Sequence, residues 1–272
     1  MQHRTCMRRS TTRIHLMRLC PLGTTICLVA PITLVGVGLL AFAPPQAATQ
    51  EWEVHDRNRP QPAMVSVASC CAAPSDATVL FGGTDTSAFL SGSDACKWIA
   101  ENGELCITSG SGNVQTKESF GSCQLHIEWM VPETCKCEGQ QGCNSGIFFM
   151  GRYELQLLGS NPNKTYVDGM AGAMYGQYPP LVNACKPNGQ WNMYDVIFTA
   201  PKFAAGGDLE QAGAMTVFFN GVLVQNHSII KGATAHMQKA QYSAHAPKLP
   251  ISIQDHGDPL RFRNIWIRPL AD

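Results

Sequence analysis

Hydrophobic and polar residues alternate along short stretches of this chain, and turns rich in Gly, Asn, Asp and Pro separate these stretches. Alternation is typical of a strand that buries one face, and the 3.6-residue spacing of an amphipathic helix is hard to find. The pattern predicts strands at 97–100, 105–108, 113–116, 123–130, 147–150, 153–158, 192–200, 214–219, 222–225, 250–254 and 262–268. Short strands with Gly-rich turns and no clear helix indicate an all-β fold, an antiparallel sandwich or jelly roll.

Two of the connections between these strands carry a clear signal. Asn220-Gly221 lies between two apolar runs, and both residue types tolerate the positive φ angles of a two-residue hairpin. Residues 161–190 form a long, polar stretch without a strand pattern. Because long loops in compact domains are usually functional, we expect this loop to contribute to a binding site.

Polar side chains occupy one face of a predicted strand. Alternation places Arg152, Glu154 and Gln156 on the same face and apolar residues on the other. A second segment, 251–267, also mixes polar groups into strand-like sequence, with His256 near its centre. Cationic, carboxylate, amide and imidazole groups on strands are suited to a polar ligand, and a sugar is the natural candidate.

The composition argues against nucleic acid or an anionic membrane surface as the partner. The chain has 272 residues, of which 44% are hydrophobic and 15% charged, and this suits one large globular domain with processing segments. The formal net charge of zero hides an asymmetry, because residues 1–50 contain five Arg and no acidic residue. The remainder carries 15 basic and 20 acidic residues, a net charge of −5. No basic patch is expected on such a domain.

Residues 1–48 resemble a secretory signal peptide. A basic beginning is followed by an uncharged run that ends in small residues, as in segments that a signal peptidase cleaves. An uncleaved signal anchor is the alternative, because the run is long enough to span a bilayer. We therefore expect a periplasmic or secreted protein, or one anchored in the membrane and facing outward, with no other stable membrane contact. Residues 49–77 have the composition of a linker, and the predicted domain covers 78–270.

Nine of the twelve Cys lie beyond the predicted signal segment, and export makes disulfide bonds their leading explanation. The cluster of Cys135, Cys137 and Cys143 is also compatible with a zinc knuckle. No His lies at ligand spacing beside the cluster, so a loop stapled by a disulfide is the favoured interpretation. The odd number of Cys leaves at least one thiol free or paired with another chain.

Several short motifs in a fixed order give the chain a family resemblance. They are Leu80-Phe81-Gly82-Gly83, Asn144-Ser145-Gly146-Ile147-Phe148, Tyr153-Glu154-Leu155-Gln156, Asp168-Gly169-Met170-Ala171-Gly172-Ala173-Met174-Tyr175-Gly176, Gln190-Trp191-Asn192, Asn220-Gly221, Gln254-Asp255-His256-Gly257 and Phe262-Arg263-Asn264-Ile265. Together they resemble the 3-keto-disaccharide hydrolase family, also described as 3-keto-glucoside-1,2-lyase/3-keto-2-hydroxy-glucal hydratase. The resemblance covers 78–270 and implies a concanavalin A-like β-sandwich, in agreement with the strand pattern. One departure is Gly159, where the family commonly has Asp.

The resemblance implies that 3-keto-glucosides are cleaved by elimination. A ketone at C3 acidifies the C2 proton, a general base removes this proton, the C1 oxygen leaves, and water then adds. Such an enzyme implies an upstream dehydrogenase that oxidises C3. A retaining glycosidase would instead need two carboxylates about 5 Å apart. Laminarinase-type sandwiches carry carboxylates where this chain has Gln156 and Gly159. Two of the carboxylates used in ordinary glycoside hydrolysis are therefore missing from this chain.

The expected catalytic roles follow from this chemistry. Glu154 or His256, in that order, would be the base, and Asp255 would orient His256. Arg152 and Arg263 would stabilise the charge of the enolate. The alternatives are a salt bridge between Glu154 and Arg152, a turn-capping role for His256, and an ion pair between Arg263 and Asp255.

Amide and aromatic side chains are the expected contacts of the sugar. Asn144, Gln156 and Gln254 suit sugar hydroxyls, and Arg263 is a further substrate-binding candidate. Tyr175 and Trp191 suit the face of a pyranose ring, with the sheet core as the alternative location of Trp191.

Metal dependence and two other functions stay open at this point. A divalent metal would stabilise an enolate, and His126 and Glu128 are the candidate ligands, although no local spacing demands a metal and no cofactor is certain. The chain also fits a non-catalytic carbohydrate-binding module, or a structural or adhesion domain cross-linked by the odd Cys. An enzyme differs from the binding module in that Glu154 and His256 should face one cavity.

Overall fold

The structure is a computed structural model that describes residues 54, 57, 59–141 and 143–271. The predicted signal segment therefore lies outside the described residues. Pro62–Asp272 forms one compact unit. In the described part, the only helical element is the short 3-10 helix Val167–Gly169, and no helix there has the length and apolar character needed to cross a membrane.

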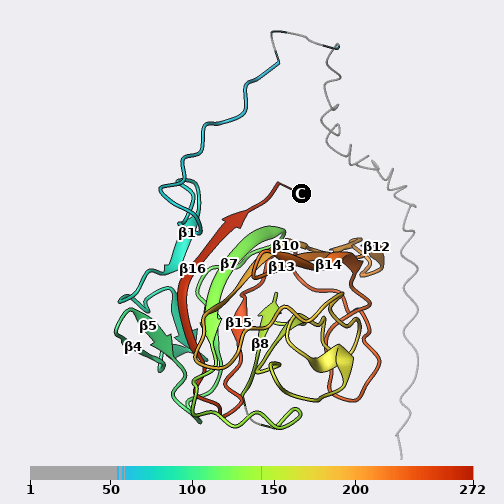
Figure 1. The fold of residues 1–272 in the computed structure, drawn as a ribbon. Coiled ribbons are helices and arrows are strands. Elements are labelled where there is room, and N and C mark those ends of the chain that lie inside the picture. Colours follow the sequence, from blue (N-terminus) through green and yellow to red (C-terminus); the bar gives the residue numbers. More distant parts are fainter. Residues whose placement is uncertain (1–53, 55–56, 58, 142, 272) are drawn as a thin grey trace, which may run out of the picture. The chain divides into compact units, whose positions relative to one another are not determined.

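The larger of the two main β-sheets has eight strands in the order β14-β13-β10-β7-β16-β5-β4, and β1 also pairs with β16. All of its pairings are antiparallel. The strands are β1 Thr78–Phe81, β4 Ile99–Glu101, β5 Glu104–Cys106, β7 Cys123–Met130, β10 Asn192–Thr199, β13 Ala214–Phe219, β14 Val222–Ile229 and β16 Arg261–Pro269. Figure 1 shows β16, β7, β10 and β13 side by side as a curved layer.

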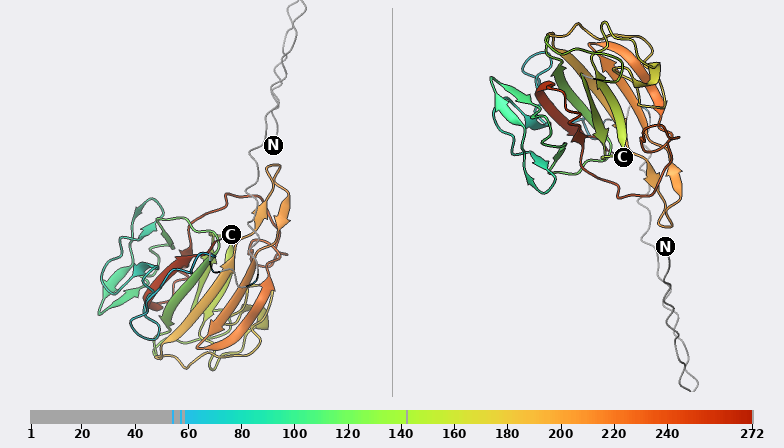
Figure 2. Two further views of the ribbon diagram at one scale, coloured as in Figure 1. Left: turned by 90° about the horizontal axis from the view of Figure 1, so that it is seen from above. Right: turned by 90° about the horizontal axis from the view of Figure 1, so that it is seen from below.

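The smaller sheet has six strands in the order β3-β2-β6-β15-β8-β9, again antiparallel. Its strands are β2 Phe89–Ser91, β3 Asp94–Ala95, β6 Val114–Thr116, β8 Asn144–Phe149, β9 Tyr153–Leu158 and β15 Ser252–Ile253. A separate hairpin consists of β11 Lys202–Phe203 and β12 Leu209–Gln211. Figure 2 shows the sheets from above and below.

Apolar side chains of the two sheets pack against each other and form the core. The ring centroids of Phe149 in β8 and Phe198 in β10 are 4.9 Å apart, and Tyr153 of β9 also packs on Phe198. These are odd-numbered positions of β8 and β9, so the even-numbered side chains point away from the larger sheet. The predicted all-β sandwich is confirmed, and so is the apolar face predicted for β9.

Every predicted strand overlaps a strand of the structure. β7, β9 and β13 have the predicted bounds, and the other predicted strands differ from the observed ones by a few residues. The sequence pattern does not predict β1, β2, β3, β11 or β12. These strands have two to four residues each, too few for alternation to be recognised.

The predicted hairpin at Asn220-Gly221 is also confirmed. The two residues join β13 to β14 and have φ angles of 51° and 81°. Such positive values are what a two-residue hairpin requires, and Gly adopts them without steric cost.

The long polar loop that was predicted to be functional covers the free edge of β9. The N–H of Gln156 donates to the carbonyl of Ala173, and the N–H of Gly172 donates to the carbonyl of Gln156. Two residues after Ala173, the N–H of Tyr175 donates to the carbonyl of Glu154. The loop thereby satisfies backbone groups that an edge strand leaves open, and it fixes Tyr175 beside Glu154.

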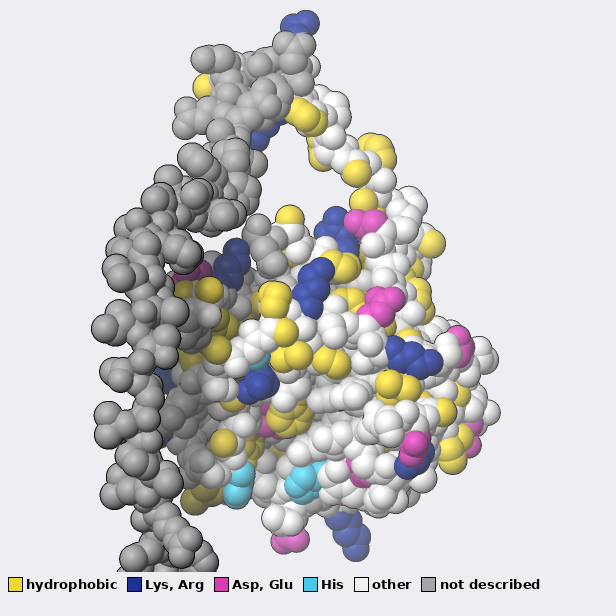
Figure 3. Space-filling model, turned by 180° about the vertical axis from the view of Figure 1, so that it is seen from behind, with side chains coloured by type: hydrophobic (Ala, Val, Ile, Leu, Met, Phe, Trp, Pro, Cys, Tyr) yellow, Lys and Arg dark blue, Asp and Glu magenta, His cyan; other side chains and the backbone are white. Residues whose placement is uncertain are grey.

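Charged side chains are mixed on the face of the domain shown in Figure 3. Lys and Arg side chains alternate there with Asp and Glu side chains, and no extended basic patch is visible among the described residues of this face. The distribution agrees with the composition of the chain beyond its first 50 residues.

Candidate active site

A cavity of about 230 Å³ opens on the outer face of the smaller sheet. Its lining residues are Asn144, Phe148, Glu154, Gln156, Tyr175, Thr234, Ala235, His236, Gln254 and His256. The structure therefore brings Glu154 and His256, which are far apart in the sequence, to one cavity.

The register of the smaller sheet explains why these side chains meet. Phe148 of β8 lies opposite Glu154 of β9, and Gly146 lies opposite Gln156. Ser252 of β15 lies opposite Phe148 on the other side, so Gln254 points to the same face two residues later. The even-numbered side chains of three adjacent strands thus form the floor of the cavity.

Glu154 is a buried carboxyl group without a cationic partner. Its side chain belongs to none of the ion pairs among the described residues, and its exposed fraction is 7%. Burial raises the pKa of Glu154 to about 8. The alternative of a salt bridge with Arg152 is not found, because the Arg152 guanidinium donates instead to the hydroxyl of Ser243. Arg152 also does not line the cavity.

Gly146 provides the space that the Glu154 carboxyl group occupies. A Cβ atom at position 146 would overlap Oε1 of Glu154 and lie 3.1 Å from its Cγ and Cδ. Gly146 has no positive φ angle, so its backbone would accept a side chain and only this contact opposes one. The N–H of Glu154 donates to Oγ1 of Thr234, which fixes the strand below the carboxyl group.

Gln156 and Asn144 form an amide network on the floor of the cavity. Nε2 of Gln156 donates to Oδ1 of Asn144 over 2.8 Å and to two backbone carbonyls, and Nδ2 of Asn144 donates to the carbonyl of Gln140. Oε1 of Gln156 is buried and has no hydrogen-bond partner among the described residues. A buried polar atom without a partner is destabilising, and such a cost is typical of residues that line a functional site.

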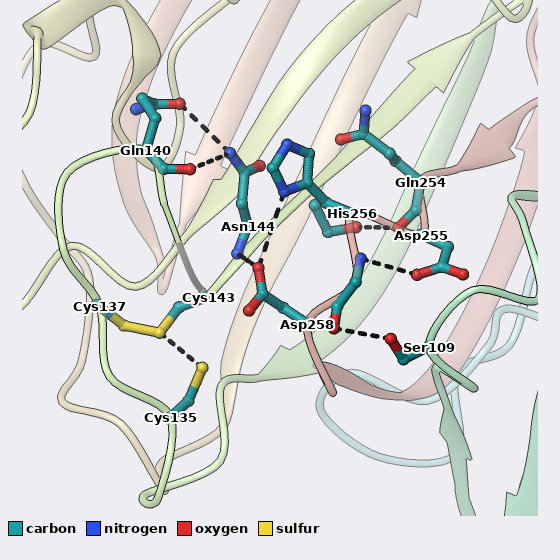
Figure 4. Close-up of polar contacts among 12 residues, drawn as sticks. Ser109, Cys135, Cys137, Gln140, Cys143, Asn144, Gln254, Asp255, His256 and Asp258 are labelled. Atoms are coloured by element: carbon teal, nitrogen blue, oxygen red, sulfur yellow. Dashed lines mark hydrogen bonds and ion pairs between the residues drawn. A yellow bond between two sulfur atoms is a disulfide. The ribbon is translucent and has the colours of Figure 1, made fainter.

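His256 lies beside Asp258, and this differs from the expected pairing with Asp255. Nδ1 of His256 is 3.9 Å from Oδ2 of Asp258, and the same oxygen accepts from the N–H of Asn144 (Figure 4). The carboxylate of Asp255 instead accepts from the N–H groups of Gly112 and Gly257. Asp255 therefore stabilises the turn after Gln254, and Asp258 is the carboxylate that faces the imidazole.

Tyr175 and His236 close the cavity from two loops. The hydroxyl of Tyr175 lies 2.7 Å from that of Tyr166 and 3.0 Å from Nδ1 of His236. Burial, followed by the hydrogen bond with Tyr166, raises the pKa of Tyr175 well above its ordinary value. His236 and Thr234 were not predicted as site residues, and the only signal for them in the sequence was the length of the strand-poor stretch between β14 and β15.

Arg263 and Trp191 do not reach the cavity. The Arg263 guanidinium lies 4.1 Å from the centre of the Trp191 ring, and its Nε donates to Glu128 over 2.6 Å. Arg263 is on β16 of the larger sheet, whereas Gln254 and His256 follow β15 of the smaller sheet. The predicted polar segment thus contributes to two sheets, and the alternative of an Arg263–Asp255 pair is also not found.

His126 and Glu128, the candidate metal ligands, are held by other side chains on the larger sheet. Nδ1 of His126 lies 2.7 Å from Asp195, and its ring stacks on Trp266 with centroids 5.1 Å apart. Burial alone would raise the pKa of Glu128, but hydrogen bonds from Asn264 and from an Arg lower it below its ordinary value. His126 and Glu128 therefore belong to a polar cluster on the larger sheet, and neither residue lines the cavity.

Among the described residues, one group of three side chains has the mutual distances that a metal site requires. It consists of Cys135, Cys137 and Cys143, whose sulfur atoms lie within 4.8 Å of one another. Glu154, His236 and His256 line one cavity, but their ligand atoms do not come this close together.

Comparisons with known proteins place the chain in a family. A comparison with curated proteins finds no match. A solved structure from Parabacteroides distasonis ATCC 8503, described as a "putative glycosyl hydrolase", is 40% identical, with a TM-score of 0.77, and the match covers 84% of this chain and 100% of that chain. A second protein of this organism with the same description is 18% identical, with a TM-score of 0.51 over 72% of this chain and 94% of its own, and supports the fold alone. The sequence model of the 3-keto-alpha-glucoside-1,2-lyase-like domain matches residues 76–268, and the chain therefore belongs to this family.

Proposed function

We propose that this protein is a carbohydrate-active enzyme that cleaves 3-keto-glucosides, including 3-keto-disaccharides, by C2 proton abstraction, β-elimination and hydration. The observation that carries the proposal is the carboxyl group of Glu154. It lies in a polar cavity, has no cationic partner among the described residues, and has a pKa of about 8. A group with a pKa near the working pH is suited to take up and return a proton. Family membership and the 40% identical glycosyl hydrolase-like structure support a glycoside-cleaving activity.

The groups in the cavity can be assigned to the steps of this reaction. The ionised form of Glu154 removes the C2 proton of the 3-keto sugar, and the C1 oxygen leaves as the double bond between C1 and C2 forms. His256, 3.9 Å from Asp258, is the second proton-transfer group, placed to protonate the departing oxygen. Tyr175 keeps its proton because its pKa is raised, so its hydroxyl can donate to the enolate oxygen.

The floor of the cavity also supports binding of a sugar. Oε1 of Gln156 is an unpaired buried acceptor, and a sugar hydroxyl is a donor of the right size and polarity. A second hollow of about 340 Å³ shares Tyr175 and Ala235 with the cavity and adds Tyr166 and Met237 to its lining. A substrate with two linked rings can occupy both hollows, with the scissile bond near Tyr175.

Ordinary retaining hydrolysis fits the cavity less well. It requires two carboxylates about 5 Å apart on either side of the glycosidic bond. Glu154 is the one carboxylate among the described residues that line the cavity. Elimination next to a ketone needs one base and therefore agrees better with this set of groups.

The proposal includes a cellular context. The enzyme requires a substrate that is already oxidised at C3, so a dehydrogenase acts before it. The signal segment predicted at 1–48 and the Cys137–Cys143 disulfide support export to the periplasm or beyond. Cell fractionation with an antibody against the domain tests the location, and recovery in the cytoplasm alone would contradict it.

The activity is tested with 3-keto-trehalose and 3-keto-sucrose, each with and without a chelator. We expect release of 3-keto-glucose and transient appearance of the unsaturated 3-keto-glucal, with no cleavage of unoxidised trehalose or sucrose. Glu154→Gln should lower kcat by roughly two orders of magnitude or more. Full turnover by both Glu154→Gln and His256→Ala would remove the catalytic assignment. Binding of the sugar without any turnover would favour a carbohydrate-binding module.

A further inference from the structure

Three cysteine sulfurs converge next to Asn144, the first residue of β8. Cys137 and Cys143 form a disulfide bond, and Sγ of Cys135 lies 2.7 Å from Sγ of Cys143. Figure 4 shows the sulfur of Cys135 beside the disulfide. A thiol next to one sulfur of a disulfide is the arrangement from which thiol–disulfide exchange begins.

The surroundings of the three sulfurs are shaped to hold them. A Cβ atom at Gly159 would overlap Sγ of Cys137 and lie 3.1 Å from Cβ of Cys143. Gly159 has no positive φ angle, so space and not backbone conformation favours glycine at this position. Nδ2 of Asn188 donates to the carbonyl of Cys135 over 3.0 Å and lies 3.4 Å from Sγ of Cys137. The same side chain therefore fixes both Cys135 and Cys137.

Two simpler functions leave part of this arrangement unexplained. A structural disulfide needs two cysteines, and it does not account for a third sulfur held against one of them. A metal site needs all three as thiolates, but two of these sulfurs are already joined to each other.

We propose that Cys135, Cys137 and Cys143 form a thiol–disulfide exchange site in which Cys143 is the shared sulfur. Cys135 loses its proton, and its thiolate attacks Sγ of Cys143. The Cys135–Cys143 bond forms while the Cys137–Cys143 bond breaks, and the Cys137 thiolate takes up a proton. One disulfide and one thiol are present before and after, so the step requires no external oxidant or reductant.

The exchange moves the anchor of the loop that leads into β8. Cys143 is followed directly by Asn144, whose side chain lines the cavity. The carbonyl of Cys143 accepts a hydrogen bond from the N–H of Gly159. Cys143 stays bonded in both forms, whereas its partner changes from Cys137 to Cys135. Burial, followed by the carboxylate of Asp258, raises the pKa of Cys135. The thiol is therefore mostly protonated at neutral pH, and exchange should take minutes to hours.

Peptide mapping distinguishes the two disulfides, because Lys136 separates Cys135 from Cys137. The full chain is oxidised with oxidised glutathione and freed of it, and samples are taken over several hours. Each is quenched with acid, alkylated and digested with trypsin. The Cys137–Cys143 bond lies within peptide 137–152, whereas the Cys135–Cys143 bond links this peptide to peptide 118–136. Because peptide 118–136 also contains Cys123 and peptide 137–152 also contains Cys137, fragmentation of the linked pair assigns the bond to Cys135 and Cys143. We expect the cross-linked pair to increase with time. A bond confined to peptide 137–152 at all times, or three reduced cysteines with a stoichiometric metal, would overturn the proposal.

Substitutions provide a second, independent test. Cys137→Ser should form the Cys135–Cys143 disulfide, and Cys135→Ser should keep the Cys137–Cys143 disulfide and lose the cross-linked pair. Cys106→Ser is the matched control, because Cys106 is a half-buried free cysteine of β5, and it should leave the exchange unchanged. A Cys137→Ser protein with only free thiols after the same oxidation would show that Cys135 cannot take over the bond.

Discussion

At the scale of single residues, the account depends on how one carboxyl group is buried. Glu154 lies on a strand whose six residues are all buried, and no cation among the described residues offsets its desolvation. Burial penalises the ionised form, so the proton is held more tightly than in an exposed Glu. Burial therefore raises the pKa of Glu154 to about 8, and the ionised carboxylate should destabilise the fold at high pH.

Glu154 should make the stability of the fold depend on pH. Its pKa rises from 4.5 to about 8 on folding. Between these values the unfolded chain ionises this carboxyl group while the folded protein keeps it protonated, so the free energy of unfolding should fall as the pH rises and level off above about pH 8. Glu154→Gln should remove this part of the slope. Urea unfolding of the wild-type and Glu154→Gln proteins between pH 4.5 and about 8 measures this slope. Equal slopes of the free energy of unfolding against pH in both proteins would contradict a buried, unpaired carboxyl group.

Gly146→Ala tests whether the place of this carboxyl group matters for activity. The added methyl group would overlap the end of the Glu154 side chain, which can rotate away at little cost to the fold. We expect kcat/KM for a 3-keto-disaccharide to fall roughly tenfold or more with little change in Tm. Gly206→Ala is the control, because a Cβ atom there contacts nothing and Gly206 has no positive φ angle. Equal activities of the two variants would argue against a catalytic position of Glu154.

At the scale of elements, the alternation of polar and apolar residues predicted correctly which face of β9 carries Glu154 and Gln156. It did not predict which sheet each strand joins. It placed Glu154 and Gln156 on one face of β9, as the register with β8 confirms. The segment around His256 was treated as one unit, but the chain passes from the smaller to the larger sheet between β15 and β16. Periodicity reports which face a side chain lies on and carries no information about which sheet the strand joins. Arg263 was misplaced for this reason.

Loop residues were the other limit of prediction from sequence. His236 reaches the cavity only because its loop folds back over the smaller sheet, and nothing in its local sequence marks such a long-range contact. The edge-covering loop was recognised by its length alone, and Tyr175 by its place in a family motif. The order of the family motifs thus identified Tyr175 as a site residue, which the periodicity of the sequence could not do.

His236→Ala tests the role of the two loops above the cavity. The imidazole joins its own loop to the one that carries Tyr175, through the 3.0 Å contact with the Tyr175 hydroxyl. Without it we expect KM to rise roughly tenfold, with a smaller change in kcat, because the loops would enclose the substrate less firmly. The control is His227→Ala, an exposed histidine of β14. Unchanged steady-state kinetics in both variants would show that the contact does not matter for binding.

At the scale of the whole molecule, the two sheets differ in how their polar side chains are paired. The larger sheet carries a polar network around His126 and Glu128, and both of these side chains have protein partners. On the smaller sheet, Glu154 and Gln156 line the cavity, the Glu154 carboxyl group has no cationic partner among the described residues, and the buried Oε1 of Gln156 has no hydrogen-bond partner there. Unpaired buried polar groups are costly, and functional sites are where such a cost is expected. Under the proposed function, the smaller sheet carries the reacting groups and the larger sheet packs against it.

The most direct test of this account follows hydrogen at C2 when 3-keto-trehalose is cleaved in heavy water. Elimination and hydration remove the original hydrogen and return one from solvent, so the released 3-keto-glucose should carry deuterium at C2, detected by NMR. Free 3-keto-glucose incubated with Glu154→Gln controls for spontaneous exchange next to the ketone. Cleavage by the wild-type protein with the original hydrogen retained at C2 would contradict proton abstraction by Glu154 and point to direct hydrolysis at C1.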